Sequence, residues 1–265
     1  FNDTATTAIC TLSLHDALPF SAALLIDLDN DGDQALALSM WPQLVLLETD
    51  GQARFTPRSY HDAVSHAASL AAADYDEDGD LDLYVMGYFS SDDTRQTPAP
   101  LPFQDANNGG TNALLRNEGD FQFTDVTAAV GMDQNNTRYT FAAAWEDYDN
   151  DGDLDLLISN SNHFATLLRN DGGNHRSWLQ ITLIGTKSNR DAVGTQVTIQ
   201  YDNQIQVREV QSSGSYCSVN DYRLHFGMNA ATQIDLVEVR WTSGSIQKLE
   251  DIAVNQHLTI IENRQ

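Results

Sequence analysis

A run of alternating aspartates offers the clearest chemistry in the sequence. It comprises Asp147, Asp149, Asp151, Asp153 and Asp155, with Gly152 at the sixth position. Alternate side chains of an extended backbone point to one face, so these carboxylates would repel one another at close range. A bound cation would remove that repulsion. Calcium takes about six to eight oxygen ligands, a loop with alternating ligands can wrap it, and glycine allows the sharp turn. The run therefore predicts a calcium-binding loop.

The same run occurs twice more, nearer the N-terminus. Residues 74–82 repeat it in full, with Asp74, Asp76, Asp78, Asp80 and Asp82. Residues 27–35 contain Asp27, Asp29, Asp31 and Asp33 but have Ala35 at the ninth position. A solvated acidic turn explains most single charge runs, but not two complete copies and a partial third. We therefore predict three sites, of which the one at 27–35 is weaker.

These loops differ from EF-hands. An EF-hand needs a bidentate glutamate at position 12, and that position here holds Leu38, Val85 and Ile158. The last carboxylate of the two complete runs falls at position nine, within the apolar stretches 81–85 and 154–158. Short apolar stretches of this kind predict buried strands. Each loop is thus expected to join one strand to the next.

Residues 21–170 repeat a unit around each loop. An apolar lead-in precedes the loop, and apolar strands and polar turns follow it, such as Ala113–Leu115 with the turn at 116–119. Four short strands in each unit are typical of a β-propeller blade. Propellers of about four to eight blades close into a ring, so three units indicate a fragment of a longer propeller.

Composition narrows the function. The chain has 265 residues and a net charge of −24, with 38 acidic and 14 basic residues. Such acidity argues against nucleic acids and anionic membranes as partners, because both attract basic proteins. No apolar run approaches the roughly 18 residues of a membrane helix. Two cysteines, Cys10 and Cys217, do not provide a disulfide framework or a CxxC metal site.

Residues 1–20 differ from the rest of the chain. The stretch from Thr6 to Pro19 resembles a translated sequencing adapter. We therefore expect residues 1–20 to be a non-native segment that takes no part in the fold.

The aspartate loops resemble FG-GAP (VCBS-type) propeller repeats, known from integrin α-subunit heads and many secreted bacterial proteins. The resemblance implies side-chain ligands at the first, third, fifth and ninth positions, and a carbonyl ligand at the seventh. The implied side-chain ligands are Asp74, Asp76, Asp78, Asp82, Asp147, Asp149, Asp151 and Asp155, with the carbonyls of Asp80 and Asp153. At 27–35 only Asp27, Asp29 and Asp31 match, since Ala35 replaces the ninth carboxylate.

After residue 172 the pattern changes to strands without acidic loops, which predicts an all-β sandwich or barrel. The predicted strands are 178–185, 194–201, 205–210, 223–226, 236–241 and 257–262. Residues 188–194, 214–216, 224–227 and 239–244 resemble the ASPIC/UnbV domain. Within the first of these stretches, Ser188 to Asp191 form a polar cluster that either binds a ligand or closes a capped turn. Propeller repeats followed by this domain resemble the cartilage-acidic-protein family, described as secreted and calcium-binding.

These observations predict an all-β chain: a partial propeller at 21–171 and an ASPIC/UnbV domain at 172–265. The expected function is a calcium-binding extracellular, periplasmic or cell-surface module for an unknown protein or carbohydrate ligand, without catalytic activity of its own. The alternative is a secreted enzyme, for example one acting on polysaccharide, with its site in the propeller channel. A cluster of His, Tyr, Arg and acidic residues at the channel would favour the enzyme.

Overall fold

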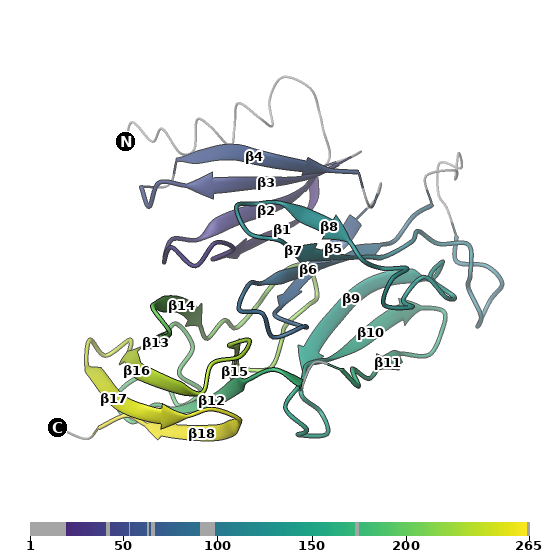
Figure 1. The fold of residues 1–265 in the computed structure, drawn as a ribbon. Helices are drawn as coiled ribbons and strands as arrows, with labels where there is room; N and C mark the ends of the chain where they lie inside the picture. Colours follow the sequence, from purple (N-terminus) through teal and green to yellow (C-terminus); the bar gives the residue numbers. More distant parts are fainter. Residues whose placement is uncertain are drawn as a thin grey trace.

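The computed structural model describes residues 20–40, 43–52, 54–62, 64, 67–90, 99–172 and 175–263. Eighteen β-strands and no α-helix occur in these ranges, which confirms the all-β prediction (Figure 1). In the described part of the chain, no helix has the length and apolar character needed to cross a membrane. Residues 1–19 lie outside the described residues, so their non-native origin stays a prediction; Phe20 is the first residue of β1.

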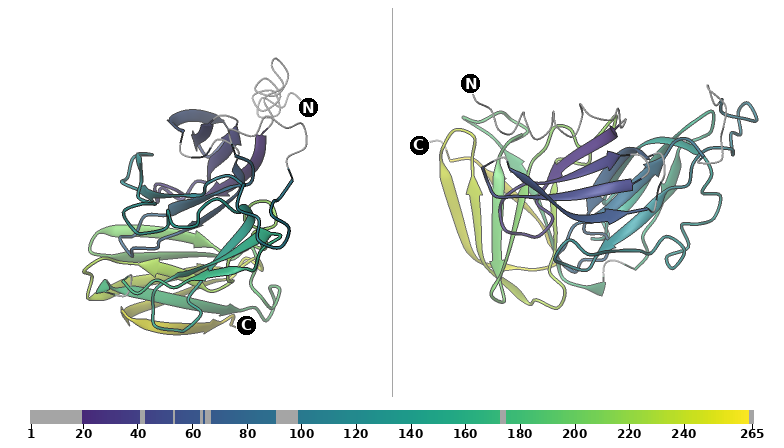
Figure 2. Two further views of the ribbon diagram at one scale, coloured as in Figure 1. Left: turned by 90° about the vertical axis from the view of Figure 1, so that its right-hand side faces the viewer. Right: turned by 90° about the horizontal axis from the view of Figure 1, so that it is seen from above.

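The N-terminal part forms three antiparallel sheets that lie side by side as propeller blades without closing a ring (Figures 1 and 2). Blade 1 contains β1 (Phe20–Ile26), β2 (Ala35–Met40), β3 (Gln43–Thr49) and β4 (Phe55–His61). Blade 2 contains β5 (Ala67–Ala73), β6 (Asp82–Gly87), β7 (Ala113–Asn117) and β8 (Phe123–Asp125). Blade 3 contains β9 (Tyr139–Glu146), β10 (Asp155–Ser161) and β11 (Thr166–Leu168). The predicted four-strand unit is therefore present in blades 1 and 2, and blade 3 has three described strands.

Small side chains let the blades pack closely at their first strands. Strand β5 packs Leu70 and Ala72 against blade 1, and Ala71 and Ala73 against blade 3. Successive side chains of a strand point to opposite faces, so a central blade must be apolar on both. This explains why the lead-in to the loop is an unbroken alanine stretch rather than an alternating pattern.

The C-terminal part is a sandwich of two sheets, with strand orders β15-β12-β18 and β14-β13-β16-β17. Its strands are β12 (Trp178–Ile184), β13 (Gln196–Tyr201), β14 (Gln204–Glu209), β15 (Leu224–Gly227), β16 (Gln233–Arg240), β17 (Ile246–Ala253) and β18 (Gln256–Ile261). One apolar core fills the space between the sheets and includes Leu179, Val197, Phe226, Val237 and Trp241. Strand β17 was not among the predicted strands, because this edge strand lacks a buried face.

Residues 211–222 of the sandwich cross the free edges of β1, β5 and β9. The Asn220 side chain accepts a hydrogen bond from the Trp145 amide (3.1 Å) and donates one to the Ala72 carbonyl (2.8 Å). The Ser218 hydroxyl accepts from the Ala143 amide of β9 (3.2 Å), and the Gln211 side chain donates to the Leu25 carbonyl of β1 (3.2 Å). Unpaired strand edges are costly when buried and prone to aggregation when exposed. We call residues 211–222 the crossing segment; it satisfies these edges and joins the sandwich to all three blades.

Candidate metal centre

Each aspartate loop forms the turn between the first two strands of its blade, as expected. The glycine at position six has a φ of 93° in Gly32, 104° in Gly79 and 106° in Gly152. Side chains are strained in this region, so the position requires glycine. Position four is also left-handed, with φ near 60° at Asn30, Glu77 and Asn150. Asparagine tolerates that conformation better than glutamate does, so Glu77 is the unusual residue of the three.

Carboxylates converge in all three loops. In each loop, three aspartates bring ligand oxygens within 4.8 Å of one another. The three groups are Asp27, Asp29 and Asp31; Asp74, Asp76 and Asp78; and Asp147, Asp149 and Asp155. The other predicted site residues, Asp33, Asp80, Asp82, Asp151 and Asp153, lie in the same loops but outside these groups. Any of the three groups could hold a metal ion.

The carboxylate at position one organises each loop from within. Asp74 accepts hydrogen bonds from the amides of Asp78 (3.0 Å) and Gly79 (3.0 Å). Asp27 accepts one from Gly32 (3.0 Å), and Asp147 one from Asp151 (3.1 Å). Hydrogen bonds from several backbone amides to one carboxylate restrict the conformation of a short loop. These hydrogen bonds therefore favour the closed shape of the loop, in opposition to the mutual repulsion of its carboxylates.

The carboxylate at position nine ties its loop to the turn after the third strand. Asp82 accepts from the amides of Tyr75 (3.2 Å) and Asn117 (2.8 Å). Asp155 accepts from the amides of Tyr148 (3.2 Å) and Asn170 (2.9 Å). Blade 1 has no such tie, because Ala35 has no carboxylate.

Asn117 and Asn170 also connect neighbouring loops, a role that the sequence analysis did not predict. The Asn117 side chain donates to the carbonyl of Leu28 in the preceding loop (2.9 Å). The Asn170 side chain donates in the same way to the carbonyl of Tyr75 (2.9 Å). The turn at 116–119 has the sequence Arg-Asn-Glu-Gly, and residues 169–172 repeat it as Arg-Asn-Asp-Gly. This repeat was the signal in the sequence that could have indicated the link between loops. The three loops form one connected structure.

Burial makes the negative charges of these loops costly. It raises the pKa of Asp74 to about 7 and that of Asp27 to about 6. Burial likewise raises the pKa of Asp82 well above its ordinary value. Burial, together with the nearby Asp74 and Asp153, raises the pKa of Glu77 to about 9. A buried carboxylate near others is unfavourable unless a cation compensates its charge.

The donor atoms suit a hard cation. Asp27 Oδ1 and Asp147 Oδ2 are buried and have no hydrogen-bond partner. Such atoms are unfavourable unless something else coordinates them. The three groups contain only carboxylates, which match the oxygen preference of calcium and magnesium rather than that of zinc or copper. Arg176 provides a partial counter-charge, with its guanidinium 3.4 Å from Asp76, but this pair is solvent-screened. The residues present therefore fit a bound cation.

The polar cluster at Ser188–Asp191 serves the sandwich itself. The buried Glu262 carboxylate accepts hydrogen bonds from the amides of Thr186 (2.8 Å), Lys187 (2.7 Å) and Ser188 (2.7 Å). It also accepts from the hydroxyl of Ser243. Within the cluster, the Asn189 side chain accepts from the Val193 amide (2.9 Å) and donates to the Val193 carbonyl (2.8 Å), so the contacts support the turn rather than a ligand site.

Glu262→Gln is expected to destabilise the protein near neutral pH and to remove part of its acid sensitivity. Burial raises the pKa of Glu262, but the hydrogen bonds from Ser243, Ser188, Lys187 and Thr186 outweigh it and hold the pKa below its ordinary value of 4.5. A group with a lowered folded-state pKa adds stability above its unfolded pKa and loses it as the pH falls through the folded value. Denaturant unfolding of both proteins between about pH 3 and 7 measures this. The exposed Glu250→Gln is the control; an equal effect there would contradict the assignment.

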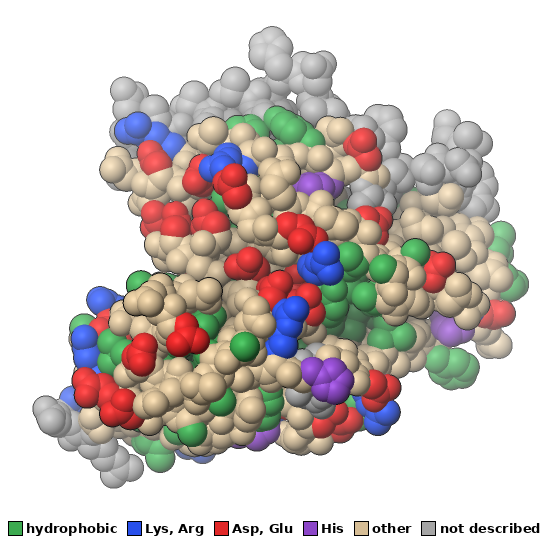
Figure 3. Space-filling view, in the orientation of Figure 1, with side chains coloured by type: hydrophobic (Ala, Val, Ile, Leu, Met, Phe, Trp, Pro, Cys, Tyr) green, Lys and Arg blue, Asp and Glu red, His purple; other side chains and the backbone are tan. Residues whose placement is uncertain are grey.

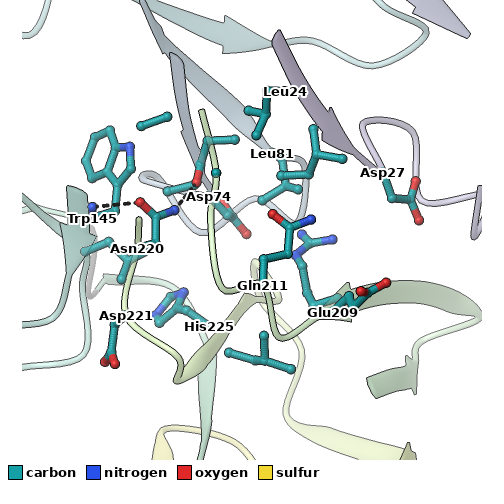
Figure 4. Close-up of a pocket in the computed structure, with 18 of the residues that line it drawn as sticks. Leu24, Asp27, Asp74, Leu81, Trp145, Glu209, Gln211, Asn220, Asp221 and His225 are labelled. Carbon is teal, nitrogen blue, oxygen red and sulfur yellow. Dashed lines mark hydrogen bonds between the residues drawn. The ribbon is translucent and has the colours of Figure 1, made fainter. Parts of the chain in front are cut away.

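A cavity of about 150 Å³ lies where the blades, the crossing segment and the sandwich meet. Trp145, Asp74, Asn220, Gln211 and His225 surround it (Figure 4). Figure 3 shows acidic side chains gathered in the middle of one face of the molecule, beside a few basic ones.

The basic residues of this cavity contact loop carbonyls. Arg208 donates to the Gly79 carbonyl (3.1 Å), Arg223 to the Asp147 carbonyl (3.1 Å), and His225 contacts the Gly152 carbonyl (3.0 Å). Burial lowers the pKa of His225 to about 4, so the ring is neutral and Nε2 carries the proton. These contacts were not predicted, because no local sequence pattern links residues so far apart.

Comparison with known proteins gives two family matches. Residues 27–85 match the family model described as FG-GAP-like repeat, and residues 185–265 match the model described as ASPIC and UnbV. No curated protein matches the chain. One solved structure, described as a Ca2+-stabilised adhesin that helps an Antarctic bacterium bind ice, is 10% identical. The alignment covers 92% of this chain and 66% of that one, and its TM-score of 0.17 supports no argument. The chain therefore contains an FG-GAP-like repeat region followed by an ASPIC/UnbV domain, as its motifs predicted.

Proposed function

We propose that this chain is a calcium-binding extracellular binding module without catalytic activity of its own. The observation that carries the proposal is the convergence of three carboxylates in each aspartate loop. Residues 74–82 and 147–155 would each hold one Ca²⁺ through these side chains and through backbone carbonyls, and residues 27–35 would bind it weakly or not at all. In this role the ion supplies positive charge and fixes the loop; it takes part in no reaction.

Calcium suits these loops better than magnesium does. Magnesium requires near-octahedral geometry and keeps several of its waters, whereas calcium accepts more ligands in variable geometry. Loops of extracellular modules bind calcium at roughly 10⁻⁴–10⁻³ M. At the same affinity these loops would be occupied only where calcium is millimolar, so an extracellular, periplasmic or cell-surface location is part of the proposal.

The test is calorimetric titration of the chelated protein with calcium, together with thermal melting. Each occupied site is expected to add about 1–2 kcal/mol of stability at millimolar calcium, because only the folded state binds the ion. Magnesium at the same concentration is expected to add less. Absence of binding heat and of any melting shift at about 10 mM calcium would contradict the proposal.

The enzyme alternative would use the channel side of the blades. The described residues that line the cavity there include His225, Arg208 and acidic residues but no tyrosine, so only part of the combination that would favour an enzyme is present. However, Arg208 and His225 contact loop carbonyls, and the crossing segment occupies the free edges of the inner strands. These contacts account for the residues without a substrate, so we favour a module that binds a protein or carbohydrate. A glycan array probed with and without calcium tests the carbohydrate option.

A further inference from the structure

The sandwich contacts all three aspartate loops through groups that the calcium proposal does not itself use. We propose that these contacts make the sandwich part of the calcium sites. The sandwich, packed against the blades, holds the loops in the conformation that binds calcium. Bound calcium in turn stabilises the packing of the sandwich against the blades. The inference rests on the calcium-binding function proposed above. Its structural basis is a set of contacts from the sandwich to the loops. Arg208, Gly227, Arg223 and His225 make hydrogen bonds to them, and the Trp178 ring covers Gly152.

Arg208 connects the first two loops. Its side chain is buried, and its guanidinium donates to the Asn30 side-chain oxygen (2.9 Å) and to the Gly79 carbonyl (3.1 Å). The Asn30 side chain also donates to the Gly79 carbonyl (3.2 Å). Both Asn30 and Gly79 have left-handed backbone conformations that the loops need for their turns. Arg208 therefore holds these turns in place, although its positive charge opposes a nearby cation.

Gly227 brings the sandwich backbone directly against the loop at 74–82. Its amide donates to Asp74 Oδ2 (3.1 Å), and the Asn229 amide donates to the Glu77 carbonyl (2.8 Å). A methyl group on Gly227 would lie 2.3 Å from both Asp74 Oδ2 and the Glu77 Cα atom. Only glycine permits this approach. The carboxylate at position one is thus oriented from both sides, by its own loop and by the sandwich.

The loop at 147–155 docks through a different set of contacts. The Trp178 ring covers Gly152, where a methyl group would lie 2.3 Å from the indole. His225 Nε2 donates to the Gly152 carbonyl (3.0 Å), and Arg223 donates to the Asp147 carbonyl (3.1 Å). As in the second loop, the sandwich contacts the glycine turn and the first aspartate position.

Coupling follows from the shared loop conformation. The sandwich binds carbonyls whose directions are set by the left-handed turns, and the ion needs those turns to bring its carboxylates together. Without the ion, mutual repulsion of the carboxylates favours a more open loop, which misaligns the carbonyls. Because linkage is reciprocal, a sandwich that favours the closed loop must raise calcium affinity by the same factor. Couplings of this kind are typically about 5–150-fold.

The first test is hydrogen exchange of the unmodified full chain, with calcium or with excess chelator. We call the contact between the aspartate loops and the sandwich, which includes Gly227 and Asn229, the seam. We expect the amides of Gly227 and Asn229 to exchange at least about tenfold faster without calcium, because the seam opens locally. Amides between β13 and β16 in the sandwich core, such as Val237, are the internal control and should not change. If calorimetry shows calcium binding while the seam amides keep the same protection, the inference is wrong and the proposed function stands. If no calcium binds, the proposed function itself fails.

The second test compares Arg208→Gln with Arg240→Gln, an exposed arginine of the same sandwich. Arg208→Gln is expected to weaken calcium binding about 5–150-fold, and Arg208→Lys to recover part of the loss. Arg240→Gln should leave affinity unchanged. Only variants that unfold cooperatively on heating are titrated. If Arg208→Gln does not fold, the hydrogen-exchange test on the unmodified chain still decides the inference. Tighter binding by Arg208→Gln would mean that charge repulsion exceeds positioning, which would overturn the assignment of Arg208.

Discussion

Trp178→Ala is expected to lower the free energy of unfolding by about 3–5 kcal/mol, a range typical of buried Trp or Phe truncations. The indole is 8% exposed and fills the space between the loop at 147–155 and the sandwich. It stacks near-parallel to His225, with the rings 6.3 Å apart, and lies 4.9 Å from the ring of His257. Its removal leaves a cavity at the seam between the two parts of the chain. For a chain of this size we expect the melting temperature to fall by roughly 6–20 °C.

Trp241→Ala is the matched control for Trp178→Ala. Trp241 is also buried, at 3% exposure, but it lies in the sandwich core. Both variants should lose stability, whereas only Trp178→Ala should also weaken calcium binding at the third loop. Thermal melting and calorimetric titration of the two variants measure this. Equal loss of calcium binding in both would show that the effect comes from general destabilisation rather than from the contact with Gly152.

Local patterns predicted most of the blades. The predicted apolar lead-ins to the second and third loops, which are the alanines at 71–73 and 142–144, lie in β5 and β9. The apolar stretches at 81–85 and 154–158 lie largely in β6 and β10. These elements were predictable because strand formation here depends on short apolar runs between turn residues. The loops were predictable for a similar reason, because alternating aspartates with a glycine at the sixth position form a local pattern that fits few backbone conformations other than a cation-binding turn.

The seam between blades and sandwich could not be predicted. Arg208 meets Asn30, 178 residues away, and Gly227 meets Asp74, 153 residues away. Neither pair has any signature within its own stretch of sequence. The crossing segment was equally hidden, because its serines and Asn220 look like an ordinary polar loop until the strand edges that they satisfy are known. Contacts across such distances depend on the completed fold rather than on local preference.

The three calcium sites are expected to be unequal, with 74–82 and 147–155 occupied and 27–35 weak or empty. The first loop lacks the carboxylate at position nine, where Asp82 and Asp155 each accept two backbone amides. A loop with fewer charges and fewer restraints binds calcium more weakly, because more of the binding energy goes to ordering it.

Calorimetric titration of Asp76→Ala, Asp149→Ala and Asp29→Ala tests this ranking, since each replaces the aspartate at position three. We expect either of the first two variants to lose one bound calcium and about 1–2 kcal/mol of calcium-dependent stabilisation at millimolar calcium. Asp29→Ala should change both quantities little. The convergence of Asp27, Asp29 and Asp31 within 4.8 Å is the feature that opposes the ranking, because it matches the other two loops. If Asp29→Ala removes as much bound calcium as the others, three carboxylates are enough, and the tie at position nine contributes to folding rather than to affinity.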